Sequence, residues 1–171
     1  MGGDLSRRIR AVAEARGVTP CQALFAVFLA SLAEARMLNQ ATANFLAKTA
    51  APRLYDYLDA MGLLPEPGGD AERDVEALLR AVNEALGVGP RLVVEKAGEG
   101  VVEVGLGGDG CRYCPKAVGL AEIPWTACPF PRLLEGLLRR HGVEARAVPH
   151  EGGGLVEKRE GLCWIRLRVG S

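Results

Sequence analysis

Apolar residues recur every three or four positions through the first half of the chain, which is the spacing of amphipathic helices. The pattern predicts a short helix from Asp4 to Gly17. A second helix begins at Thr19, with proline at its first position and glutamine at its third to complete a capping box. Further helical stripes cover residues 38–50, Pro52 to Gly62 and Asp70 to Gly87.

The spacing changes to that of strands in the second half. Two β-branched runs, Arg91 to Lys96 and Val101 to Leu106, are joined by a short glycine-containing loop and predict a hairpin. A helix from Pro131 to Arg140 follows, and then strands at 143–148 and 162–169. Helices followed by hairpin, helix and hairpin predict an α+β fold, with N-terminal helices packed with an antiparallel sheet of about four strands.

The helix that starts at Pro20 carries no charge as far as Ala33 and is apolar almost all round. Such a helix needs cover on every side. We therefore expect residues 1–65 to form a helical extension that dimerises, ahead of a domain over 66–171. An uncharged recognition helix could not grip phosphates, so the likeness to a DNA-binding helix-turn-helix is rejected and no nucleic-acid partner is expected.

Charge and composition limit the binding partners and the cellular location that we expect. Lysine plus arginine and aspartate plus glutamate both number 21, which points to neither nucleic acid nor an acidic membrane as partner. The longest uncharged apolar run is shorter than the ~20 residues that cross a bilayer, and no secretory signal opens the sequence. We expect a cytoplasmic protein, where paired cysteines bind metal more often than they form disulfides, hyperthermophiles excepted.

Four of the five cysteines follow residue 110, at Cys111, Cys114, Cys128 and Cys163. The first two form a C-x2-C pair, whose sulfurs a tight turn can bring to one tetrahedral centre. Four thiolates favour zinc, and an iron–sulfur cluster uses the same ligands. The alternatives are a redox pair, which the poor helix start at Pro115 disfavours, or plain buried and surface cysteines.

Other chemistry is sparse in the sequence. His141 fits the last turn of a helix and His150 a hairpin loop, and Cys21 fits a helix core. There is no G-x-S-x-G, no H-E-x-x-H and no phosphate-binding loop. We name no catalytic residue and favour a binding protein over an enzyme.

Three stretches of the sequence match a known domain family in their order: the acidic helix that ends at Leu86 to Gly89, the run Cys128 to Leu138, and the tail Glu160 to Leu167. With the hairpin strands, they make the region from Asp70 to Val169 resemble the vinyl-reductase-type (4-vinyl reductase) small-molecule-binding domain. That family shares its fold with subunits of the TRAPP vesicle-tethering particle and with haem-based nitric-oxide sensors. The sequence departs from the family at Leu155, near a place where the family usually has a cysteine.

The resemblance implies a module that binds or senses a small hydrophobic ligand. Cysteines of the family have been proposed to bind metal, which favours zinc on the set chosen from the sequence, Cys111, Cys114, Cys128 and Cys163. The pair Cys111/Cys114 lies where the family is variable, so the resemblance does not itself supply these two ligands. A thiol or iron–sulfur redox enzyme and a pure assembly subunit are the alternative functions. Candidate ligand contacts in the helices are Phe25, Phe28, Phe45 and Tyr55.

Overall fold

A computed structural model describes residues 2–170 and confirms the α+β fold with N-terminal helices and an antiparallel sheet. The elements are α1 (Gly2–Arg16), α2 (Pro20–Glu34), α3 (Gln40–Ala60), α4 (Ala71–Leu86), β1 (Leu92–Gly98), β2 (Val101–Leu106), η1 (Gly108–Gly110), α5 (Phe130–Arg140), β3 (Ala145–Val148), β4 (Glu157–Arg159) and β5 (Leu162–Val169). None of the helices in this described range combines the length and the apolar run that a bilayer crossing needs.

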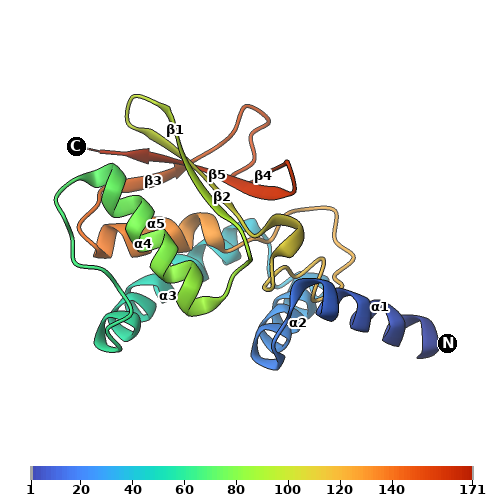
Figure 1. The fold of residues 1–171 in the computed structure, drawn as a ribbon. Coiled ribbons are helices and arrows are strands. Elements are labelled where there is room, and N and C mark those ends of the chain that lie inside the picture. The colour runs from blue at the N-terminus through green and yellow to red at the C-terminus, as the bar shows by residue number, and fades with distance from the viewer. Residues whose placement is uncertain (1, 171) are drawn as a thin grey trace.

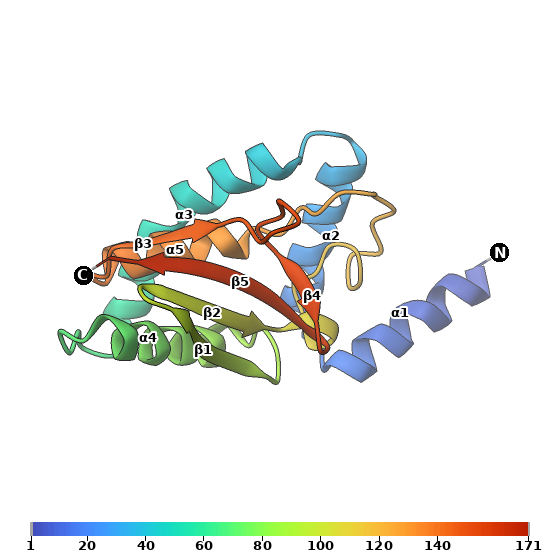
Figure 2. The same cartoon turned by 90° about the horizontal axis from the view of Figure 1, so that it is seen from above.

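The sheet is built around its last strand, β5. Strands run in the order β1-β2-β5-β3, and every pair is antiparallel. The short strand β4 also pairs with β5, through residues 162–164, while β3 pairs with residues 166–169 of the same strand. Figure 2 shows β3 and β4 following each other along β5. The three-residue β4 adds a strand that is too short for a sequence pattern to predict.

One face of the sheet forms the main core. The register sets Val104 opposite Ile165 and Val102 opposite Leu167, and all four side chains are buried. Helices α4 and α5 lie below this face in Figure 1 and supply the rest of the cluster. The predicted alternation of the last strand is therefore confirmed, and it leaves Cys163 on the core side at the start of β5.

Helix α4 shows how the sequence defines its ends. The Asp70 carboxylate accepts hydrogen bonds from two backbone N–H groups of the first turn, at 3.1 and 3.2 Å. Gly87 ends the helix at φ 62° and ψ 46°, a conformation that glycine adopts without strain. Between these caps one apolar stripe is buried against the sheet and α5: Val75, Leu78, Leu79 and Val82.

Helix α3 corrects one prediction. It runs without a break from Gln40 to Ala60, so the helix start predicted at Pro52 is wrong. Proline removes one helical hydrogen bond, but packing against α5 keeps the helix continuous. A Cβ added at Gly136 of α5 would lie 2.4 Å from the Cβ of Ala51, so the two helices touch closely next to Pro52. Residues before 65 thus contribute to the main core, and the proposed domain boundary stays a prediction.

Helix α2 begins with the predicted capping box, in which Thr19 N–H donates to the Gln22 side chain at 2.9 Å. One side of the helix packs in a second small core with the segment 121–127. The other side is exposed and carries Leu24, Phe25, Val27 and Phe28. The chain itself therefore covers only half of this apolar helix.

The outer face of the sheet carries a buried carboxylate. Glu103 is 5% exposed and accepts hydrogen bonds from Arg159 at 2.8 Å and from Arg166 at 3.0 and 2.8 Å. Burial alone would raise the pKa of Glu103, but the hydrogen bonds and charges of the two arginines outweigh it and lower the pKa. Glu103 thus links β2 to β4 and β5.

Replacing this carboxylate tests the link. Glu103→Gln should lower the free energy of unfolding at pH 7 by about 2 kcal/mol, because two charge-assisted partners are lost. The folded pKa lies below the unfolded one, so the deficit should vanish as pH falls through the folded pKa. Urea denaturation across pH measures both. Glu76→Gln, which breaks an exposed pair with Arg80, is the control and should cost under about 1 kcal/mol; equal costs would contradict the prediction.

Candidate metal centre

Cys111, Cys114, Cys128 and Cys163 are the four tail cysteines. The segment between β2 and α5 carries the first three of them. It leaves the sheet through Gly107 and Gly108, both at positive φ near 60°. A Cβ at Gly108 would lie 2.0 Å from the carbonyl oxygen of Gly161, so only glycine lets the chain turn against the start of β5. Asp109 N–H then donates to the same Gly161 oxygen at 3.0 Å. This turn brings Cys111 to the end of the sheet.

Strand pairing brings the last cysteine to the same place. Cys163 lies opposite Leu106 of β2 on one side and opposite Lys158 of β4 on the other. Because Leu106 is the last residue of β2, the loop that follows it starts beside Cys163. Cysteines 52 residues apart in the sequence, 111 and 163, therefore meet at one end of the sheet.

Arginine side chains tie the cysteine loop to the helices. Arg16, the last residue of α1, donates to the carbonyl oxygen of Cys111 at 2.7 Å. In return, Arg112 Nε donates to the carbonyl of Arg16 at 2.7 Å, and Arg112 Nη1 donates to that of Gly87 at 3.1 Å. Tyr113 Oη reaches the Leu86 carbonyl at 2.7 Å. Sequence reasoning missed these anchors, because isolated arginines and a tyrosine give no signal of their partners.

The remaining cysteines are held by the next parts of the same segment. The carbonyl of Cys114 accepts from the N–H groups of Val118 and Gly119, at 2.8 and 3.2 Å. Gly119 packs on α2 so tightly that an added Cβ would lie 2.4 Å from the Ala26 carbonyl oxygen. Cys128 stands two residues before the start of α5.

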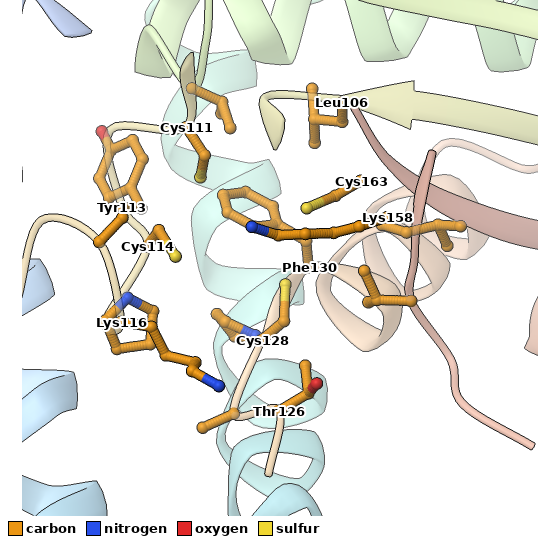
Figure 3. A pocket seen from close by; sticks show the side chains of 17 residues that line it. Leu106, Cys111, Tyr113, Cys114, Lys116, Thr126, Cys128, Phe130, Lys158 and Cys163 are labelled. Atoms are coloured by element: carbon orange, nitrogen blue, oxygen red, sulfur yellow. The ribbon is translucent and has the colours of Figure 1, made fainter. Parts of the chain in front are cut away.

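All four tail cysteines line one cavity of about 430 Å³. Figure 3 shows their sulfurs pointing toward the same space from the loop, from the start of α5 and from β5. Most of the remaining lining is apolar, including Leu106, Phe130 and Ile165. Two lysines, Lys116 and Lys158, are the charged residues of the lining, which holds no carboxylate and no imidazole.

Burial disfavours the thiolate form of three of these cysteines, Cys111, Cys128 and Cys163. Burial raises the pKa of Cys111 to about 11, and it raises the pKa of Cys128 well above its ordinary value. The pKa of Cys163 is also raised by burial, against the opposing charge of Lys158. All five cysteines of the chain are free thiols. Cys21 is exposed on α2 and lies outside the cavity, so its predicted core position is wrong.

The four thiols line the cavity but do not meet at one coordination centre. Among the residues that the structure describes, no three His, Cys, Asp or Glu side chains lie close enough together to hold one ion. His141 is buried beside Tyr55, with 2.9 Å between Nδ1 and Oη, and His150 bonds the Trp164 carbonyl at 3.0 Å. Neither histidine lines the cavity.

The aromatic residues suggested as ligand contacts also lie elsewhere. None of Phe25, Phe28, Phe45 and Tyr55 lines the cavity. Phe25 contacts a residue of the lining, because its ring packs edge-on against Tyr113, with 5.7 Å between centroids. The lining aromatics are instead Tyr113 and Phe130.

Comparison with known proteins gives a family without a described activity. The MJ0207 family matches residues 36–169, a range that includes the four tail cysteines. The uncharacterized protein MJ1342 of Methanocaldococcus jannaschii is 36% identical over 67 residues, which are 39% of this chain and 59% of that protein. The chain therefore spans less than two thirds of that relative's length. No solved structure matches the chain, and the resemblance to the vinyl-reductase type stays a prediction.

The turn at Gly108 offers a test of how the cysteines are brought together. Gly108→Ala should destabilise the fold by about 3 kcal/mol, because the new methyl group meets both the Gly161 backbone and a left-handed conformation. Gly62→Ala is the matched control, since Gly62 has φ 66° with open space around it, and it should cost only about 1 kcal/mol. Urea denaturation measures both, and equal costs would show that the close approach to β5 does not matter.

Proposed function

The chain belongs to the MJ0207 family, and we propose that its four tail cysteines bind a thiophilic metal centre. The observation that carries the proposal is that cysteines from the loop after β2, from the residues before α5 and from β5 line one cavity whose lining contains no carboxylate and no imidazole. Sulfur donors alone suit zinc or an iron–sulfur cluster and do not suit Mg²⁺ or Ca²⁺. Zinc is the simplest occupant, and the cluster is the alternative.

Charge supports an anionic centre in this cavity. Four thiolates around a divalent ion or a cluster core of charge 2+ carry a net charge of 2−. The two lysines of the lining, Lys116 and Lys158, would balance that charge. Their positive charge has no such role beside four neutral thiols.

The centre would stabilise the fold. It would join the loop after β2, the start of α5 and the start of β5. Because burial favours the protonated form of Cys111 and Cys128, metal binding would release protons, and part of the binding free energy would become folding free energy. We expect the protein to work in the cytoplasm, where thiols stay reduced.

A second candidate is the binding of a small apolar molecule in the same cavity. The volume of about 430 Å³ and the mainly apolar lining suit one. A second apolar gap, between α4 and the sheet, holds only about 10 Å³ and is too small for any organic ligand. Ligand and metal would then share the thiol-lined cavity.

Metal content tests the first proposal. Protein purified without a histidine tag should contain thiolate-bound metal, either about one zinc ion or iron with sulfide. Cys114→Ser should lose that metal and lower the melting temperature by roughly 5–10 °C. Elemental analysis and thermal unfolding measure these outcomes. Cys21→Ser, an exposed thiol outside the cavity, is the control and should change neither. A metal-free chain that is equally stable with all four thiols replaced would refute the centre.

The exposed side of α2 suggests a homodimer as a further part of the proposal. Phe28 is 60% exposed, and three more apolar residues lie beside it on α2. An apolar surface of this kind marks a protein interface.

Phe28→Glu should weaken self-association at least 100-fold, because a charge would be buried in the interface. Analytical ultracentrifugation over a concentration series measures this change. Tyr57→Glu is the control, because Tyr57 is similarly exposed on α3 and lies outside α2. A wild-type chain that is monomeric at all concentrations would remove the dimer from the proposal.

A further inference from the structure

The four tail cysteines line one cavity without forming a three-ligand site for a single ion. Zinc–sulfur bonds of 2.3 Å put the sulfurs of a tetrahedral site about 3.8 Å apart. Yet no three His, Cys, Asp or Glu side chains in residues 2–170 lie close enough to hold one ion, although four thiols line one cavity. Figure 3 shows the sulfurs of Cys111, Cys114, Cys128 and Cys163 placed around an open centre.

The size of the cavity agrees with this spacing. A volume of about 430 Å³ is many times the roughly 10–15 Å³ that a cavity needs in order to hold one water. One ion would occupy only a small part of that space. An occupant larger than a single ion fits the space better.

The supports of the cysteines oppose closure onto one ion. Cys163 is held in the sheet between Leu106 and Lys158. The carbonyl of Cys111 is bonded to Arg16, and the turn before it rests on Gly161. The strand pairing and the turn fix the backbone of both cysteines, so only rotation of their side chains can change the distance between the two sulfurs.

The chemistry of the lining limits the kind of large occupant. Iron–sulfur clusters are held by four cysteine thiolates, and their stability and potential depend on limited exposure to solvent. The cavity supplies four thiols, apolar walls that include Leu106, Phe130 and Ile165, and no carboxylate or imidazole ligand.

We infer that the cavity holds an iron–sulfur cluster ligated by Cys111, Cys114, Cys128 and Cys163. The inference rests on the proposed metal centre and identifies its occupant. The two lysines at the cavity would balance the negative charge of the cluster and its thiolates.

The test is the composition of the unaltered full chain. The protein is expressed in medium that contains both iron and zinc, and it is purified without oxygen and without a histidine tag. Iron, zinc and acid-labile sulfide are then measured per chain. The expected result is iron and sulfide in equal amounts, at least two of each, with broad visible absorption and a paramagnetic resonance signal after reduction by dithionite.

Two other results separate the failure of the inference from that of the proposed function. About one zinc per chain without sulfide would overturn the cluster and leave the metal centre intact. A chain with neither zinc nor iron would overturn both. Cys163→Ser should lose at least half of the sulfide and the visible absorption, whereas Cys21→Ser should keep both in full. Because the unaltered chain decides the question, a variant that fails to fold does not affect the outcome.

Discussion

The antiparallel pairing of β2 with β5 is the constraint on which the rest of this structure depends. It sets the last residue of β2, Leu106, beside Cys163, so the loop that follows β2 starts at the end of β5. Gly108 can then turn against Gly161 because neither backbone meets a side chain there. The backbone, rather than any favourable contact between sulfurs, brings the cysteines of the loop and the strand to one cavity.

Such a cavity is hard to explain as a feature of a stable core alone. Buried cysteines usually behave as small apolar residues that fill space. Here four cysteines face a space of about 430 Å³ with two lysines at its wall, and burial raises the pKa of three of them, Cys111, Cys128 and Cys163. A core selected for packing would close this space with larger side chains. A bound group that contacts the four sulfurs would give this arrangement a physical reason.

The sequence predicted those parts of the fold that have a local cause. Caps at Thr19 and Asp70 and the alternation of the last strand follow from neighbouring residues, and they occur where expected. The continuity of α3 through Pro52 depends on packing against α5, and the anchoring of the cysteine loop depends on partners about 95 residues away, such as Arg16. The four cysteines singled out from the sequence line one cavity, but the contacts that bring them there arise from tertiary structure.

Two contacts between aromatic rings connect the exposed side of α2 to the cysteine cavity. Phe25 on α2 packs edge-on against Tyr113, and Tyr113 packs in the same way against Phe130, with 6.2 Å between the last two ring centroids. Both Tyr113 and Phe130 line the cavity. Gln22 of the same helix donates to the carbonyls at the end of α4, at 3.1 and 3.0 Å. A partner that covers Phe25 would therefore act on Tyr113, which lines the cavity. Binding in the cavity and binding on α2 would then depend on the same side chains.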